Sequence, residues 1–555
     1  MILYICVYLR PSLVMPGTTE DIEDTERTEH CNRPLRSSAH SAVRNELISS
    51  RPQFALTRVL LPAAGGGVLA GGRRVVNHLI LPVKPIDLII CIQSIIIMIP
   101  KFINREIELE FLENCYNSSS PEFIVIYGRR RVGKTELIQK SLKGKHGAYF
   151  LASKDTTHEN LNEFKQSIAE QLNIPLFSKL ESNTWTEIFE NLAEFLDETK
   201  KTIIVIDEFS YLIEVDRAVP SLFQKIWDQI LKTKNVMLIL CGSSVSLMES
   251  EVLGVRSPLF GRRTGQWEVT QLQIEAVKKF VPGYNTEDVL KTIFMLGGIP
   301  AYLDKWDDGK TVFENMEEHI LSKGRYLYEE ADFLLKHEFR EQWIYALILK
   351  KLSLGYNSLA KLYSATNMDK ANLSKYLNTL ENLHIIRHIL PIHKRKGGIY
   401  VIIDDYFDFW FRFVYSNRGM LEVGNKKQVR GKVERDFNSY CGRRFEYLVE
   451  KMVGWNCVEI PFGYTGISKW WHKDVEIDLL VVNDESRDVL FMECKWKKLT
   501  LKQSLKILGE LEMKAEQVDW NKGRRKEFFG LAAKKIESKD ELREKGFVVF
   551  DLDDV

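Results

Sequence analysis

Residues 128–135 read Gly128-Arg129-Arg130-Arg131-Val132-Gly133-Lys134-Thr135 and follow the pattern G-x-x-x-x-G-K-[ST] of a phosphate-binding loop. The two glycines allow a tight turn in which successive backbone N–H groups point at one phosphate. The lysine reaches the β- and γ-phosphates, and the threonine hydroxyl is a ligand for a magnesium ion. These eight residues therefore predict a site for ATP and Mg²⁺.

The segments on both sides of this loop predict an α/β fold. Residues 123–127 form a short apolar run typical of a buried strand, and residues 136–142 have helical spacing. The phosphates would then lie at the N-terminus of a helix, where unpaired N–H groups and the helix dipole favour anions.

A second strand, which ends in carboxylates, predicts hydrolysis as well as binding. Residues 202–206 are apolar and are followed by Asp207 and Glu208. In an open α/β sheet, ligands bind at the C-terminal ends of the strands, which is where such carboxylates would lie. We expect Asp207 to hold the magnesium ion through water and Glu208 to orient the attacking water as a general base. Two solvated acids would give the same pattern, but the preceding phosphate-binding loop favours the catalytic interpretation.

Two further residues are candidates for the ATPase reaction. Residues 236–242 predict a third strand, and Ser243 follows it as a candidate sensor of the γ-phosphate. Arg262 or its neighbour Arg263, which follow a polar loop, is a candidate arginine finger. An ordinary serine after a strand and a solvated basic pair remain open alternatives, as does the question of whether the finger acts within or between chains.

Residues 297–300, Gly-Gly-Ile-Pro, break the chain between helical segments, as a lid subdomain would. Together with the phosphate-binding loop and residues 206–209 and 257–262, this motif resembles the archaeal-type AAA ATPases of the STAND-related group. The resemblance covers residues 98–555 and implies a P-loop ATPase core with a parallel sheet and a helical lid. It also implies a fused C-terminal nuclease-like domain of unassigned function.

Residues 338–405 predict a winged helix. A helical segment at 370–383 is followed by two strands, 385–389 and 399–403, which flank a basic hairpin tip at 394–398. A helix-turn-helix with a basic wing is an arrangement that reads DNA. The same fold also serves as a packing module within ATPases, so DNA contact and a purely structural role both stay open.

Residues 475–482 and 489–496 predict a β-hairpin with a second catalytic candidate. Asp478 interrupts the first apolar run, and Glu493 and Lys495 share one face of the second strand because side chains alternate with a period of two. A buried carboxylate needs a cation beside it. Two carboxylates, Asp478 and Glu493, with a neighbouring lysine suit a magnesium site for phosphodiester hydrolysis.

This hairpin resembles the PD-(D/E)xK nuclease core, which has an α/β restriction-endonuclease-like fold. Glu446, on a predicted preceding helix, matches the acid that many members of that group add to the site. Ile477 stands where many members have proline. A catalytically silent descendant, held together by an Asp478–Lys495 ion pair, is the alternative.

Composition limits the functions that the chain can have. The 555 residues carry a formal net charge of +1, so no global charge drives the protein to nucleic acid or membrane. Eight scattered cysteines without a C-x-x-C pair argue against a zinc site or a disulfide framework and fit a reducing cytoplasm. The apolar stretch 86–99 is too short to span a bilayer comfortably, so we expect no membrane partner.

The changes in pattern along the chain predict five segments. Residues 11–75 mix proline, glycine, threonine, serine and arginine without a helical or strand period. We hypothesise that translation starts at Met98, which the intact mass of the natively expressed protein would show. A disordered extension or a weak membrane-surface anchor is the alternative. The predicted segments are an irregular extension (1–97), an ATPase core (98–272), a helical lid (273–337), a winged helix (338–405) and a nuclease-like domain (406–555).

The sequence thus predicts a cytoplasmic Mg²⁺-dependent ATPase. Its nucleotide state would control a C-terminal half that binds DNA and that is a candidate for cleaving it. A STAND-like signalling switch that assembles partners, with an inert nuclease-like domain, is the alternative. ATP and Mg²⁺ are the expected cofactors and DNA is the expected partner, while assembly into homo-oligomers stays open.

Overall fold

The computed structural model describes residues 59–61, 79–81 and 102–554, except 393 and 395. The chain divides into two compact units, residues 1–96 and 97–555. The described part of the first unit is a pair of antiparallel strands, β1 (Val59–Leu61) and β2 (Leu79–Leu81). The hypothesis that translation starts at Met98 concerns a residue outside the described ones.

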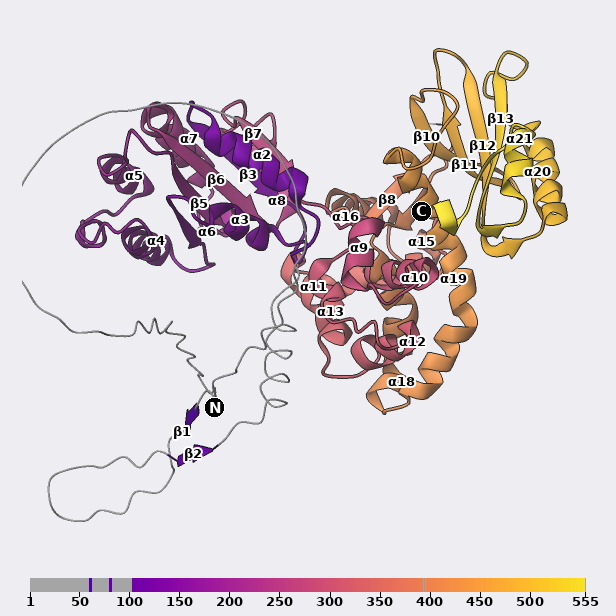
Figure 1. The fold of residues 1–555 in the computed structure, drawn as a ribbon, viewed down its shortest axis with the longest axis horizontal. Helices are drawn as coiled ribbons and strands as arrows, with labels where there is room; N and C mark the ends of the chain where they lie inside the picture. Colours follow the sequence, from indigo (N-terminus) through magenta and orange to yellow (C-terminus); the bar gives the residue numbers. More distant parts are fainter. Residues whose placement is uncertain (1–58, 62–78, 82–101, 393, 395, 555) are drawn as a thin grey trace, which may run out of the picture. The chain divides into compact units, whose positions relative to one another are not determined.

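The second unit begins with a parallel sheet of five described strands, in the order β4-β5-β6-β3-β7 (Figure 1). This sheet confirms the α/β class predicted for this part of the chain. Its strands are β3 (Glu122–Tyr127), β4 (Gly147–Leu151), β5 (Thr202–Asp207), β6 (Val236–Gly242) and β7 (Gly265–Glu268).

Both faces of this sheet are buried, because alternate side chains pack into different clusters. Phe123 and Val125 pack with residues of α4, α5 and α7, whereas Ile124 and Ile126 pack with residues of α2 and α3. A strand that is buried on both faces is a continuous apolar run, as these sequences are. The helices of this region are α2 (Glu106–Asn117), α3 (Lys134–Leu142), α4 (Thr157–Gln171), α5 (Trp185–Ala193), α6 (Phe209–Val215), α7 (Val219–Gln229) and α8 (Val245–Met248).

Helices dominate the chain from residue 274 to residue 454. Among them, Asp369 accepts a hydrogen bond from the backbone N–H of Asn372 and so caps α16 at the position that its sequence predicts. The elements are α9 (Ile274–Phe280), α10 (Thr286–Leu296), α11 (Pro300–Leu303), α12 (Val312–Asn315), α13 (Tyr326–Glu338), α14 (Gln342–Ser353), α15 (Leu359–Thr366), α16 (Lys370–Asn382), the antiparallel pair β8 (Ile386–Ile389) and β9 (Ile399–Ile402), α17 (Asp405–Phe409), α18 (Arg418–Glu422) and α19 (Lys426–Gly454).

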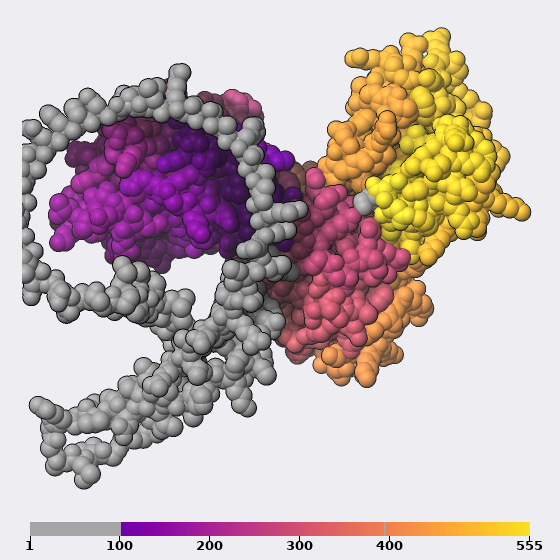
Figure 2. Space-filling model, viewed as in Figure 1, coloured from indigo at the N-terminus to yellow at the C-terminus, as the bar shows by residue number. Residues whose placement is uncertain are grey.

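The C-terminal region contains a mixed sheet of five described strands, in the order β10-β11-β12-β13-β14. The first three strands pair antiparallel, and β12, β13 and β14 pair parallel. The space-filling view shows the end of this region as a continuous yellow surface (Figure 2). The elements are β10 (Gly466–His472), β11 (Val475–Val482), β12 (Asp488–Leu499), α20 (Leu501–Ala515), β13 (Lys526–Ile536), α21 (Lys539–Glu544) and β14 (Val548–Phe550).

One continuous cluster of buried residues runs from Leu272 to Leu552. It includes residues of α10, of α16, of α19 and of β12, so it joins the lid region to the C-terminal sheet. The segment boundaries expected at 272, 337 and 405 stay predictions. The shared core contains residues on both sides of 337 and of 405, so packing does not separate the segments at these two positions.

Candidate nucleotide site and C-terminal acidic cluster

The loop 128–133 joins the end of β3 to the start of α3, as its sequence predicts. Gly128 has a φ of 149°, and a Cβ atom there would overlap the backbone oxygen of Val269. Gly133 has a φ of 92°, in the region that favours glycine. Both glycines of the motif are therefore required by the backbone, independently of any ligand.

A pocket of about 630 Å³ adjoins this loop and the N-terminus of α3. The P-loop side chains Lys134 and Thr135 line it, together with Glu208 and Ser243 from the ends of neighbouring strands. Lys134 is 6% exposed, and its Nζ donates to the backbone oxygens of Gly128 (2.8 Å) and Arg129 (2.9 Å). The backbone of the loop thus holds the ammonium group of Lys134 in place.

Asp207 accepts three hydrogen bonds at the end of β5. Thr135 Oγ1 and the Tyr149 hydroxyl each donate to its Oδ2 at 2.7 Å, and the N–H of Glu208 donates to its Oδ1 at 2.8 Å. Burial raises the pKa of the Tyr149 phenol, so it stays a donor at neutral pH. A threonine hydroxyl beside a strand-end carboxylate is the oxygen donor set that Mg²⁺ requires, so the residues present fit this ion.

Ser243 follows β6 and Glu208 follows β5. Because β6 lies between β5 and β3, the strand before the P-loop, Ser243 lies next to Glu208. The backbone N–H of Ser243 (3.2 Å) and its hydroxyl (2.7 Å) both donate to Glu208 Oε2. Glu208 has a φ of 52°, a left-handed conformation that is uncommon outside glycine. The structure therefore brings the predicted base and the predicted sensor into direct contact.

The structure does not bring Arg262 to the phosphate site of its own chain. Arg262 precedes β7, whose first residue, Gly265, pairs with Ile124 near the start of β3. The P-loop follows the other end of β3, so Arg262 lies at the opposite edge of the sheet. Its Nε donates to Asp228 at 2.8 Å. A finger role for Arg262 could therefore apply only to a neighbouring chain.

The three arginines of the P-loop contact carboxylates far along the sequence. Arg129 pairs with Asp404, and Arg131 Nε pairs with Glu330 at 3.2 Å. Arg130 lies 3.8 Å from a carboxylate oxygen of Glu338. Sequence reasoning assigned these arginines to the loop without foreseeing these partners, because the pattern leaves the four positions between its glycines unspecified.

The Gly-Gly-Ile-Pro motif lies against the same pocket. Gly297 has a φ of 67°, and a Cβ atom on Gly298 would overlap the backbone oxygen of Leu272. Pro300 lines the nucleotide pocket and lies within 4 Å of the position of a Cβ atom on Gly133. This motif therefore positions the start of α11 over the P-loop.

The predicted C-terminal residues also come together. Lys495 Nζ donates to Asp478 Oδ2 at 3.1 Å and pairs with Glu493. Lys514, on α20, donates to the other oxygen of Glu493 at 2.6 Å. Asp478 also accepts a hydrogen bond from the backbone N–H of Cys494 at 2.8 Å. The carboxylates of Asp478 and Glu493 are both buried. Lys514 was not predicted, because helical spacing alone does not show which lysine of α20 faces the sheet.

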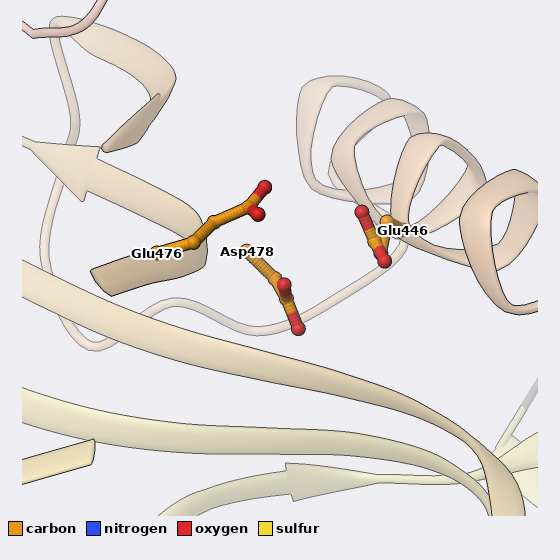
Figure 3. A group of neighbouring side chains, drawn as sticks. All are labelled: Glu446, Glu476 and Asp478. Carbon is orange, nitrogen blue, oxygen red and sulfur yellow. The ribbon is translucent and has the colours of Figure 1, made fainter. Parts of the chain in front are cut away.

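Three carboxylates gather beside this hairpin. Ligand oxygens of Glu446, Glu476 and Asp478 all lie within 4.8 Å of one another. Figure 3 shows Glu446 on α19 and the other two on β11. Lys469 Nζ donates to Glu446 at 2.5 Å and lies 3.6 Å from Glu476. Glu476 and Lys469 were not predicted, although Glu476 lies two residues before Asp478 and so on its face of the strand.

Burial raises the pKa of Glu446 to about 7, and the charge of Asp478 adds to this rise against the opposing effect of Lys469. The folded protein therefore binds a proton here that the unfolded chain releases near pH 4.5. In the presence of EDTA, we expect the free energy of unfolding to contain a contribution from Glu446 that falls between about pH 5 and 7. Its slope is at most about 1.4 kcal/mol per pH unit. Denaturant unfolding of wild type and Glu446→Gln at several pH values checks this, and equal slopes in the two proteins would contradict it.

One face of α16 carries exposed polar side chains. Asn372, Lys375 and Asn378 are exposed, while Leu373 and Leu377 on the other face are fully buried. Lys394 and Lys396, between β8 and β9, are exposed as well.

Among the residues that the structure describes, no helix is both long and apolar enough to cross a membrane.

Comparisons with known proteins agree with this organisation. Residues 102–306 match the model of an ATPase domain found predominantly in Archaea, and residues 410–507 match a domain of archaeal and bacterial proteins of unknown function. An uncharacterized protein of Methanocaldococcus jannaschii is 34% identical over 468 residues, which is 82% of this chain and 99% of that protein. A solved Walker-type ATPase of Pyrococcus abyssi is 22% identical, with a TM-score of 0.44, and the match covers 57% of this chain and 98% of that one.

The archaeal ATPase domain and the P-loop pocket make the chain an ATP-binding ATPase. Its likeness to the Methanocaldococcus jannaschii protein covers 82% of this chain and 99% of that protein. The chain therefore belongs to the same family as that protein, and in this chain an archaeal ATPase domain precedes a C-terminal domain of unknown function.

Proposed function

We propose that this ATPase depends on Mg²⁺ and that its nucleotide state controls a C-terminal domain that binds DNA and cleaves it with a divalent cation. One chain of contacts carries this proposal. Arg129 of the P-loop pairs with Asp404, the neighbouring Asp405 pairs with Arg444 of α19, and α19 also carries Glu446 of the acidic cluster. The phosphate-binding loop and the candidate cleavage site are thus linked through two ion pairs and one helix.

At the nucleotide site, Thr135 and Asp207 would hold the magnesium ion, and Lys134 would bind the β- and γ-phosphates. The ion would neutralise the charge on the phosphate oxygens. Glu208 would accept a proton from the attacking water, and the hydrogen bonds from Ser243 fix the position of its carboxylate. Tyr149 would keep Asp207 oriented toward Thr135 through its hydrogen bond to the same oxygen.

At the C-terminal site, Asp478 and Glu493 would hold the divalent cation, and Glu446 and Glu476 beside Asp478 would offer further carboxylate oxygens. Such an ion would polarise a phosphodiester and activate a water molecule. The pKa of Lys495 is raised by the carboxylates beside it, so Lys495 is a cation that can stabilise charge on the phosphate. DNA would meet the exposed face of α16 and the basic tip between β8 and β9, in the manner of a winged helix.

Incubation with mixed DNA and Mg²⁺ or Mn²⁺ tests cleavage. Wild type is expected to cut, and Asp478→Asn and Glu493→Gln are each expected to lower the rate at least about 100-fold, because each removes one carboxylate charge from the cation site. Glu485→Gln is the matched control, since Glu485 is exposed in the turn between β11 and β12. Absence of cleavage by wild type in every nucleotide state, or equal cleavage by all variants, would contradict the nuclease activity.

A second function is favoured by the ion pairs themselves. Lys469, Lys495 and Lys514 already neutralise Glu446 and Glu493, as they would in a domain that binds no metal. In that case the chain is an ATP-dependent switch whose C-terminal domain only assembles partners. Isothermal titration with Mn²⁺ separates the two functions. A nuclease is expected to bind Mn²⁺ with measurable heat, and Asp478→Asn is expected to lose that heat, whereas an inert domain shows no such binding in either protein.

A further inference from the structure

We propose that Arg130, within the P-loop itself, supplies the positive charge that stabilises the γ-phosphoryl group during hydrolysis. This role goes beyond the proposed function and needs no activity of the C-terminal domain. It gives the ATPase reaction an arginine from its own chain, whereas Arg262 lies at the far edge of the sheet.

The position of Arg130 is the first support. Arg130 lines the same pocket as Lys134, Glu208 and Ser243. Lys134 marks where the β- and γ-phosphates bind, and Glu208 marks where the attacking water would lie. A guanidinium group in the same pocket can therefore approach the region where negative charge develops.

The way in which Arg130 is held is the second support. Its Nη2 donates to the Tyr211 hydroxyl at 2.6 Å, and its guanidinium carbon lies 5.8 Å from the centre of the Tyr211 ring. Tyr211 belongs to α6, and its backbone N–H donates to the backbone oxygen of Glu208 at 2.8 Å. Arg130 is therefore tied to the segment that carries the general base. Charge that is oriented before the reaction stabilises a transition state without a reorganisation cost.

The third support is a donor left without a partner. Arg130 Nε is buried and has no hydrogen-bond partner among the described residues; it forms a long ion pair with Glu338 Oε1 at 3.8 Å, beyond hydrogen-bond distance. Arg129 and Arg131 donate to the carboxylates of Asp404 and Glu330, whereas Arg130 donates to the neutral Tyr211 hydroxyl. Buried donors are nearly always satisfied, so this guanidinium keeps hydrogen-bonding capacity for an acceptor toward which it can turn. A γ-phosphate oxygen is an acceptor of the required charge.

The chemical step balances without a further reactant. Water attacks the γ-phosphorus, the bond from that phosphorus to the β–γ bridging oxygen breaks, and the electron pair leaves with ADP. The proton of the water passes to the Glu208 carboxylate and is later released with phosphate. Arg130 changes neither its covalent bonds nor its protonation, because it acts only through charge and hydrogen bonds.

Steady-state ATP hydrolysis and binding of fluorescent ADP test this role in the full-length protein. We expect Arg130→Ala to lower kcat about 1000-fold, the lower end of the range for arginine fingers, with ADP affinity changed less than about threefold. The variant is also expected to lose the stable complex of ADP with aluminium fluoride. Arg130→Lys is expected to recover part of the rate, and Tyr211→Phe to lower kcat about tenfold, because it removes only the hydrogen bond that orients the guanidinium.

Arg217→Ala is the matched control, because Arg217 is exposed and pairs only weakly with Glu251 across 3.7 Å. Retention of kcat within twofold in Arg130→Ala would overturn the proposal, as would equal losses of kcat and ADP affinity. A large loss in Arg262→Ala without one in Arg130→Ala would assign the role to a neighbouring chain instead. Tyr211→Phe removes one hydroxyl and keeps the ring, so an unchanged rate in this variant counts against the proposal even if Arg130→Ala fails to fold.

Discussion

Replacing Lys134 with alanine is expected to abolish ATP hydrolysis. Lys134 is buried at the N-terminus of α3, and its ammonium group is held by the backbone oxygens of Gly128 and Arg129. Lys305 also lines the pocket, but Lys134 is the lysine of the phosphate-binding loop itself, so alanine would leave the β- and γ-phosphates without their main counter-charge. We expect kcat to fall at least about 100-fold, the size of effect seen when one preorganised donor to a transition state is removed.

Phosphate release and binding of fluorescent ATP measure this effect. Lys143→Ala is the matched control, because Lys143 is an exposed lysine at the other end of α3. The control is expected to keep wild-type turnover. Turnover of Lys134→Ala within twofold of wild type would contradict the assignment of this loop as the phosphate site.

Replacing Arg444 with methionine is expected to cause a large loss of stability. Arg444 is 5% exposed, and its Nε donates to Asp405 at 2.8 Å while its Nη1 donates to the backbone oxygen of Ile402 at 2.8 Å. Methionine fills a similar volume but leaves the buried Asp405 without its cation. Breaking a buried pair in this way costs about 3–5 kcal/mol.

Denaturant unfolding, followed by circular dichroism, measures this cost. Arg435→Met on the same helix is the matched control, because Arg435 is exposed and pairs with its sequence neighbour Asp436. Such surface pairs contribute at most about 1 kcal/mol. The double variant Asp405→Asn/Arg444→Met should recover part of the loss. A change below about 1 kcal/mol in Arg444→Met would show that Asp405 is not left uncompensated.

The nucleotide site was largely predictable because each of its parts leaves a local signal. The glycines of the P-loop are required by positive φ, and a continuous apolar run before a carboxylate is typical of a buried parallel strand. These signals predicted β3, β5 and β6 with the residues that follow them. The contact of Ser243 with Glu208 was not predictable in this way, because it depends on the order of the strands in the sheet, which no local pattern specifies.

The remaining features depend on contacts that are distant in the sequence. The hydrogen bond of Tyr149 to Asp207 joins residues 58 positions apart, and the pair of Arg129 with Asp404 joins residues 275 positions apart. Arg262 was a reasonable candidate as a basic residue after a polar loop. It lies at the wrong edge of the sheet for its own chain because β7 runs parallel to β3. The direction of a strand is a property of the fold, and sequence spacing does not show it.

The single buried cluster from Leu272 to Leu552 has a mechanical consequence. Close-packed interiors deform little. Because the lid region and the C-terminal sheet share this core, we expect them to move together as one rigid body. This body meets the P-loop through polar contacts, among them the ion pairs of Arg129 with Asp404 and of Arg131 with Glu330. A movement of Arg129 or Arg131 is therefore expected to shift this packed body as a whole, through Asp404 and Glu330, without local unfolding.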